Sequence, residues 1–411
     1  MSTTDRDLPE APRHTLPSRT EFVALMAMLS ALVAFSIDSM MPVLPEIAAD
    51  LAAENPNAAQ LVITSFVLGM GLGTFFTGPL SDHFGRRAVI LGGSLLYVVA
   101  ALAAVGSESM TWLLVTRLVQ GLGAAGPRVV VMAVVRDLYA GRGMAQITSF
   151  IMMVFAIVPA LAPLMGAQIV KVFDWHAIFL AFALFGTLTT GWFLLRIPET
   201  LRPERRRPFR PALLRDALKE MLARPDVRLP ILTLALCFAS LFATISSIQP
   251  VYEVWAGRGE SFPMWFGATA VITATSSYVN ARLVVRLGMR LLVKAILIAH
   301  IAVSLVVLSV MAVASAPLAL FAALLLWQQV QFFQAGLTIG NLNAIAMEPM
   351  GHIAGTAASV ISASATVLAV VLAVPVGLAF NGTPLPLIVG SLLYAALALM
   401  LMIRLGAEEA P

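Results

Sequence analysis

Twelve long apolar runs dominate this sequence and limit what it can fold into. A helix needs about 20 mostly apolar residues to cross the hydrocarbon core of a bilayer. Hydrophobic residues make up 59% of the 411-residue chain and charged residues only 12%, so one water-soluble core could not hide the apolar surface. We therefore expect an all-α integral membrane protein with twelve transmembrane helices. The runs begin near Phe22, Leu61, Ala88, Trp112, Ala145, Ala177, Leu229, Pro263, Leu291, Pro317, Ile353 and Pro384.

The first run follows a polar, proline-rich segment and is longer than the core of a signal peptide. It also lacks a small-residue cleavage site after it, so we expect it to be a retained span.

Basic residues are distributed unevenly between the two sets of loops. The loops after odd-numbered runs carry only Lys171 and Arg258, whereas the other basic residues of the loops follow even-numbered runs. Cytoplasmic loops of membrane proteins carry the excess of Lys and Arg. Both termini and the long central loop are therefore predicted to be cytoplasmic, and the net charge of +4 reflects topology rather than nucleic-acid binding.

The only long polar loop divides the twelve runs into two sets of six. We expect a cytoplasmic tail (1–20), an N-terminal six-helix bundle (21–196), a cytoplasmic linker (197–228), a C-terminal six-helix bundle (229–405) and a second tail (406–411). Within the linker, residues 211–223 have helical character. They either lie on the membrane surface, where their basic residues meet anionic lipid, or form a solvated tether.

A short repeat supports this division. The loop sequence "GPLSDHFGRR" (78–87) returns 203 positions later as "ARLVVRLGMR" (281–290), with Leu, Gly and Arg in register. Parallel six-span repeats are one of the arrangements from which transporters are built, with the ligand site between the halves near the midplane.

The segment 78–87 resembles the loop signature of the major facilitator superfamily, although His83 stands where Arg or Lys is more usual. "RLVQGLGAAG" (117–126) is similar to the arginine-bearing motif of span four. "MPVLPEI" resembles the drug:proton antiporter branch, and "NLNAIAMEPMGHIAGTAAS" with "FNGTPLP" resembles its bicyclomycin and chloramphenicol resistance group. This resemblance implies the major facilitator fold of two six-helix bundles. The signature residues are Gly78, Asp82, Gly85, Arg86 and Arg87.

The same resemblance suggests a conformational latch, in which Asp82 reaches Arg136 and the amino-terminal end of span eleven near residues 351–355. The helix dipole there favours an anion. A surface salt bridge with little energetic value is the alternative.

The antiporter signature of span five is only partly met. Pro159, Pro163 and Gly166 are present, while Ala162 and Ala167 stand where glycine is expected. Small residues still permit close approach of helices.

Asp38 is a carboxylate within the first apolar run, and Arg117 lies at a similar depth in the fourth. A charge at membrane depth costs at least ~2.5 kcal/mol, so such residues pair or face a wet cavity. We predict a contact between Asp38 and Arg117, direct or through water, and a role in proton coupling. A structural pair that braces two helices is the alternative.

Arg128 is the second arginine of the fourth run and stands next to Pro127. We expect its side chain to snorkel or to brace the helix; the alternative is that it binds substrate or a proton on the cytoplasmic side.

Three amides in span ten, Gln328, Gln331 and Gln334, share one broad helical face. Amides donate and accept hydrogen bonds without charge, which suits polar or amphipathic drugs. Hydrogen bonding between helices is the competing role. With Met152 and Phe155, these residues are our candidate substrate cavity.

These patterns predict a transporter rather than an enzyme. The sequence has neither a phosphate-binding glycine loop nor a metal-ligand spacing, so we expect a proton gradient as energy source, with no cofactor, metal or nucleic-acid partner. The leading hypothesis is a monomeric, multi-pass drug:proton antiporter of the bacterial inner membrane that exports small amphipathic or polar drugs. A proton-coupled transporter of a sugar or amino-acid derivative and a non-transporting receptor or scaffold are the alternatives.

Overall fold

The computed structural model describes residues 17–406, and over this range the chain is helical with no strand. Twelve long helices correspond one to one to the predicted spans, so the expected all-α membrane fold is confirmed. They are α1 (Arg19–Asp38), α3 (Leu61–Phe84), α4 (Arg86–Val105), α5 (Met110–Leu138), α6 (Gly141–Val172), α7 (Ala177–Arg196), α9 (Pro225–Pro250), α10 (Phe262–Leu287), α11 (Met289–Val313), α12 (Pro317–Met347), α13 (Ala354–Leu378) and α14 (Leu385–Arg404).

Shorter helices connect these spans. The α-helices are α2 (Leu44–Leu51) and α8 (Pro211–Ala223), the latter within the linker. The remainder are 3-10 turns at Met41–Val43, Pro56–Gln60, Pro203–Arg205 and Glu348–Ile353 and a π-helical turn at Val251–Trp255.

Ten segments of the described chain are long and apolar enough to cross a membrane. One of them, Pro317–Leu378, contains both α12 and α13. Helix α10 is not among them, because Thr, Ser and Asn residues in its middle lower its hydropathy. It nevertheless packs between α6 and α12 like the other spans.

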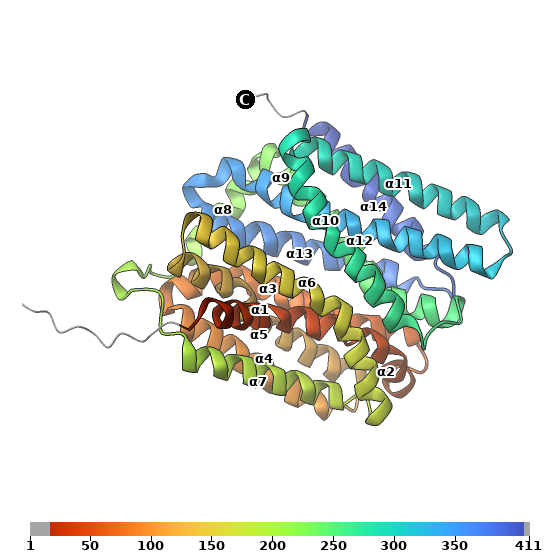
Figure 1. Ribbon diagram of the computed structural model, residues 1–411, viewed down its shortest axis with the longest axis horizontal. Helices are drawn as coiled ribbons and strands as arrows, with labels where there is room; N and C mark the ends of the chain where they lie inside the picture. Colours follow the sequence, from red (N-terminus) through yellow and green to blue (C-terminus); the bar gives the residue numbers. More distant parts are fainter. Residues whose placement is uncertain (1–16, 407–411) are drawn as a thin grey trace, which may run out of the picture.

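The long helices form two bundles, α1 to α7 and α9 to α14, which lie one above the other in Figure 1. Helix α5 packs on α3 and α4 in the first bundle, and α9 packs on α12, α13 and α14 in the second. The bundles touch mainly along two helix pairs, α3 with α13 and α6 with α10.

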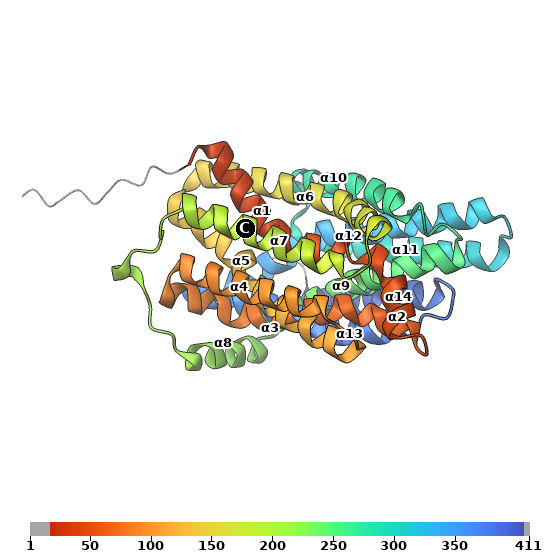
Figure 2. The ribbon, with the colours of Figure 1, turned by 90° about the horizontal axis from the view of Figure 1, so that it is seen from below.

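The two ends of the molecule differ. At the linker end lie α8 and the start of α1, and at the other end lies α2 (Figures 1 and 2). A cleft of about 730 Å³ opens between the bundles near α2, so we call this the cleft end. Its lining comprises Pro42, Pro45 and Glu46 from the first bundle and Gln249, Glu253 and residues 257–261 from the second.

The repeated loops have the same backbone conformation in both halves. Gly85 separates α3 from α4 with φ of 101°, and Gly288 separates α10 from α11 with φ of 75°. Glycine adopts positive φ without the steric penalty that a Cβ brings. The glycine that recurs 203 positions apart therefore makes the same tight turn in each half.

Candidate functional site

Helix α1 ends at Asp38, well inside the apolar segment. Pro42 has no backbone N–H, so it cannot donate to the carbonyl of Asp38 and continue the helix. The chain instead makes a turn and a 3-10 segment, Met41–Val43, before α2 begins. The side chain of Asp38 lies at this break, and the residue is 5% exposed. Within residues 17–406 no hydrogen bond or ion pair engages its carboxylate.

Arg117 on α5 is fully buried close to the same break. Its Nη2 donates to the carbonyl of Ser36 at 2.9 Å, and its Nε donates to the carbonyl of Val62 on α3 at 3.1 Å. Its Nη1 donates to Oε1 of Gln120 at 2.7 Å, and the guanidinium carbon lies 4.4 Å from the ring centroid of Phe66. The arginine thus joins three helices of the first bundle.

Asp38 and Arg117 make no direct contact among the described residues, so the direct form of the predicted contact is wrong, while a contact through water stays a prediction. The physical reason is the break in α1. The amide of Met40 donates to Ile37, which leaves the Ser36 carbonyl without a helical partner. Arg117 donates to this free carbonyl, and Ser36 lies two residues before Asp38. Arg117 therefore binds the backbone at the end of α1 and is not an ion-pair partner of Asp38.

Two further polar residues belong to this cluster. The Tyr97 hydroxyl lies 2.6 Å from Oγ of Ser36, whose own proton goes to the Leu32 carbonyl at 2.7 Å. Tyr97 and Gln120 were not predicted. The sequence signal that could have identified them is that each is a polar side chain within an apolar span. Both are fully buried in the structure.

Helix α6 passes directly against the break. A Cβ built on Gly166 would lie 2.1 Å from the backbone oxygen of Ser39, so only glycine fits here. Pro159 and Pro163 lie within the same helix, which continues through both. The predicted antiporter helix thus contacts the residue that follows Asp38.

The predicted amides are buried inside the second bundle. Gln328 accepts a hydrogen bond from the Tyr252 hydroxyl at 2.9 Å and donates to Thr269 Oγ1 at 3.0 Å. Gln331 accepts from Ser240 Oγ at 2.7 Å. Hydrogen bonding between helices, the competing role, therefore describes these contacts.

Within the three predicted amides, two buried atoms have no partner among the described residues, Nε2 of Gln331 and Oε1 of Gln334. Met152 on α6 is 46% exposed. The side chain of Phe155 lies outside the described residues. Arg128 on α5 is half-buried one residue after Pro127, and the contacts of the described chain include none for its guanidinium.

The residues of the predicted latch form a charge network at the linker end, in which the expected contact between Asp82 and Arg136 is not present. Arg86 Nη1 donates to Asp82 Oδ1 at 2.6 Å and to Ser81 Oγ at 2.8 Å, and its Nε donates to Asp137 Oδ2 at 2.9 Å. Asp82 therefore pairs with Arg86 and not with Arg136, which is exposed. Arg136 and Asp137 are adjacent on the last turn of α5, and the rotation of that helix presents the aspartate to the loop.

The linker completes this network through Glu199. Its two carboxylate oxygens accept from the backbone amides of Arg86 at 3.0 Å and Arg87 at 3.1 Å, the first residues of α4. A carboxylate at a helix N-terminus satisfies free amides and complements the helix dipole. Arg87 in turn donates from Nη1 and Nη2 to the carbonyls of Ile197 and Leu194. The sequence contained no signal for Glu199.

Gly78 lies on α3 and faces the other bundle. A Cβ on this residue would stand 2.6 Å from Oγ of Ser359 on α13. The loop signature therefore combines a tight helix crossing with the charge network at the linker end.

Comparison with known proteins places this geometry in a family. The family model described as Major Facilitator Superfamily matches residues 26–374. A "Bicyclomycin resistance protein homolog" of Haemophilus influenzae is 32% identical over 268 residues, which are 65% of this chain and 67% of that protein. A "Chloramphenicol resistance protein" of Pseudomonas aeruginosa is 36% identical over 158 residues, 38% of each chain. The resemblance noted in the sequence is thereby confirmed.

A solved structure shares the fold at low sequence identity. The "Crystal structure of D-xylose-proton symporter" aligns with a TM-score of 0.75 and 14% identity, covering 95% of this chain and 99% of that one. The two bundles, the recurring glycine loop, the family model and the relatives agree: the chain belongs to the Major Facilitator Superfamily.

Proposed function

We propose that this transporter is a drug:proton antiporter, which exports small amphipathic or polar drugs across the bacterial inner membrane by alternating access. The distribution of basic residues supports cytoplasmic termini, so the linker end would face the cytoplasm and the cleft end the outside. The observation that carries the proposal is Asp38, a buried carboxylate without a fixed partner at the break in α1.

The absence of an ion pair is what makes Asp38 suitable for coupling. A carboxylate in a permanent salt bridge must break that bridge before it accepts a proton. Asp38 has no such bridge among the described residues, and a charge at membrane depth is costly. Protonation therefore removes a cost without breaking a contact, and a bound cation or polar drug can have the same effect.

Arg117 has a separate role in this proposal. Its hydrogen bonds to Ser36, Val62 and Gln120 hold α1 against α3 and α5, so it positions the broken helix end that carries Asp38. Proton entry from the outside then neutralises Asp38, weakens its hold on a bound drug and favours return to the inward-facing state.

The relatives support drugs as the cargo, because the names of two of them refer to bicyclomycin and chloramphenicol resistance. The energy source is proposed to be the proton gradient. Each elementary charge that moves inward gains ~2.3 kcal/mol per 100 mV of membrane potential.

The charge network at the linker end is proposed to act as a conformational latch. Asp82, Arg86 and Asp137 tie the end of α3 to the end of α5, and Gly78 brings α3 against α13. Movement of one bundle relative to the other would change the contacts in this region.

Everted membrane vesicles test the function. A pH-sensitive dye reports proton release when phenicols, lipophilic cations or sugars are added, for wild type, Asp38→Asn and Asp216→Asn. Asp216 is an exposed carboxylate of α8 and serves as the matched control. We expect release with one drug class in wild type and the control, and none in Asp38→Asn. Equal release from Asp38→Asn would remove Asp38 from the coupling step, and release only with sugars would favour a metabolite as cargo.

A further inference from the structure

The two ends of the molecule are closed to different degrees, as the buried apolar clusters show. At the linker end each bundle has its own cluster of buried residues. At the cleft end a single cluster contains residues of both bundles. The 3-10 segment Met41–Val43 of the first bundle packs there against α9 of the second.

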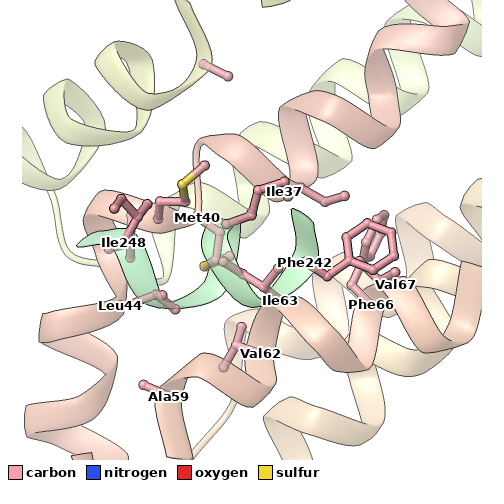
Figure 3. Close-up of a cluster of buried hydrophobic side chains, with 14 of the residues drawn as sticks. Ile37, Met40, Leu44, Ala59, Val62, Ile63, Phe66, Val67, Phe242 and Ile248 are labelled. Atoms are coloured by element: carbon pink, nitrogen blue, oxygen red, sulfur yellow. The ribbon is translucent and has the colours of Figure 1, made fainter. Parts of the chain in front are cut away.

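The central part of this shared cluster is drawn in Figure 3. Ile37, Met40 and Leu44 of the first bundle lie with Phe242 and Ile248 of the second, and Met40 and Ile248 are fully buried. Water cannot cross such a packed apolar layer without separation of the bundles. We call these five residues the apolar plug.

Polar contacts reinforce the plug at the same end. Ser247 Oγ on α9 donates to Gln60 Oε1 at 2.7 Å, and both residues are buried. Asn57 Nδ2 donates to the carbonyl of Leu378, the last residue of α13, at 3.0 Å and to the carbonyl of Phe380 just after it at 2.8 Å. Each of these bonds joins the first bundle directly to the second.

The fit around Gln60 requires a glycine on the facing helix. A Cβ on Gly377 would lie 2.6 Å from Oε1 of Gln60. Because Gln60 must lie this close to accept from Ser247, a small residue on α13 is part of the contact. We call Asn57, Gln60, Ser247 and Gly377 the polar clamp.

Asp38 and the cleft lining are separated along the chain by residues of the plug. Along the first bundle, Asp38 is followed by the plug residue Met40, and the cleft lining begins only after Met40, at Pro42, Pro45 and Glu46. On α9, Phe242 and Ile248 likewise precede the cleft residues Gln249 and Glu253. In both bundles, therefore, a plug residue precedes the start of the cleft lining.

We propose that the apolar plug and the polar clamp together form the gate that separates Asp38 from the cleft, so that release of the clamp is the step that exposes Asp38 to the cleft side. This inference rests on the proposed transport function, because a gate has a purpose only in alternating access. The hydrogen bonds of the clamp set the fraction of time for which the gate is open, and the apolar packing of the plug excludes water when the gate is closed.

Thiol labelling tests the gate without any measurement of transport. Cys237, the single cysteine, is buried and is replaced by Ser. A reporter, Ala243→Cys, is placed on α9 about 7.5 Å from Ile248 towards the linker end, by helix rise. Ala243 is buried, so its labelling by a membrane-impermeant maleimide added to whole cells reports an open gate. Glu260→Cys, in the cleft lining, reports reagent access in every background.

Two clamp variants are compared with a matched control. Ser247→Ala and Gln60→Ala remove the hydrogen bond between the bundles, whereas Ser246→Ala removes a hydroxyl that bonds only to Ala243 of its own helix. Loss of one hydrogen bond shifts an equilibrium by about two- to tenfold. We expect the labelling rate of the reporter to rise by that factor in the clamp variants and to stay unchanged in the control, with constant labelling at Glu260→Cys.

Equal reporter rates in Ser247→Ala, Gln60→Ala and Ser246→Ala would overturn the proposal. So would a parent protein whose reporter labels as fast as Glu260→Cys, since the plug would then not be closed. A variant with a folding defect is recognised by its reduced amount in the membrane, and Asn57→Ala then replaces it as the clamp variant. Failure of proton release in vesicles would contradict the proposed function but would leave these labelling rates unaffected, so the two failures are distinguishable.

Discussion

Arg117 on α5 donates a hydrogen bond of 2.9 Å to the carbonyl oxygen of Ser36 on α1, two residues before the buried carboxylate of Asp38. The bond exists because the helix breaks immediately afterwards and leaves that carbonyl free. A helix interruption, which is a local property, thus creates the acceptor that a distant arginine needs.

Replacement of Arg117 by Lys is expected to destabilise the first bundle. A lysine ammonium cannot reproduce the planar fork that bonds simultaneously to Ser36, Val62 and Gln120. Hydrogen bonds to charged groups contribute ~1.5–3 kcal/mol each, so we expect a loss of at least about 2 kcal/mol. Thermal unfolding of the detergent-solubilised protein measures it. Arg136→Lys, an exposed position, is the control, and equal melting temperatures for both variants would contradict the assignment.

Gly166→Ala is expected to abolish transport and lower stability together. The added methyl carbon would meet the backbone oxygen of Ser39 at 2.1 Å, and backbone cannot rotate away as a side chain can. Either α6 or the end of α1 must move, which changes the packing next to Asp38. Gly191→Ala, where a Cβ meets nothing within 4 Å, should retain transport. Drug efflux from loaded cells measures both, and full activity of Gly166→Ala would show that this contact is dispensable.

Glu199→Gln is expected to loosen the linker. In glutamine one of the two oxygens is replaced by an NH2 group, which donates and cannot accept, so the present bonds from the amides of Arg86 and Arg87 to separate oxygens cannot both be kept. The neutral side chain also no longer complements the N-terminus of α4. Trypsin cleavage within residues 202–210 should be several-fold faster than in wild type. Glu204→Gln, at an exposed position of the same linker, should match wild type. Identical cleavage rates in all three proteins would argue against docking of the linker through Glu199.

Gly85→Ala is expected to destabilise the loop by ~1–2 kcal/mol or more, because alanine is strained at a φ of 101°. The new Cβ would also stand 2.5 Å from Oε2 of Glu199. By contrast, Gly92→Ala in the open middle of α4 should be neutral or stabilising, by up to ~1 kcal/mol. Thermal unfolding compares the two variants. A neutral effect at Gly85 would mean that the turn adopts another conformation.

Much of the fold could be predicted from the sequence, because hydropathy and turn chemistry act locally. The twelve spans follow from apolar runs of bilayer length. The recurring Gly85 and Gly288 indicate the same turn in both halves, since only glycine tolerates that backbone without cost. Asp38 and Arg117 stand out as charges in apolar segments, and each is buried in the structure.

The partners of these residues were decided by the tertiary structure. Sequence depth suggested that Asp38 would meet Arg117, but the packing of α5 against α1 and α3 brings the guanidinium to the carbonyls of Ser36 and Val62. Asp82 pairs with Arg86 rather than Arg136, because the last turn of α5 presents Asp137 instead.

Similarly, Glu199, Tyr97 and the contact between Gln60 and Ser247 become visible only when distant segments lie side by side. The sequence by itself determined which segments enter the membrane and which of them carry charge, because those properties belong to single residues and their near neighbours. Which groups meet depends on the rotation and crossing of whole helices, and that is set by side-chain packing across the bundles.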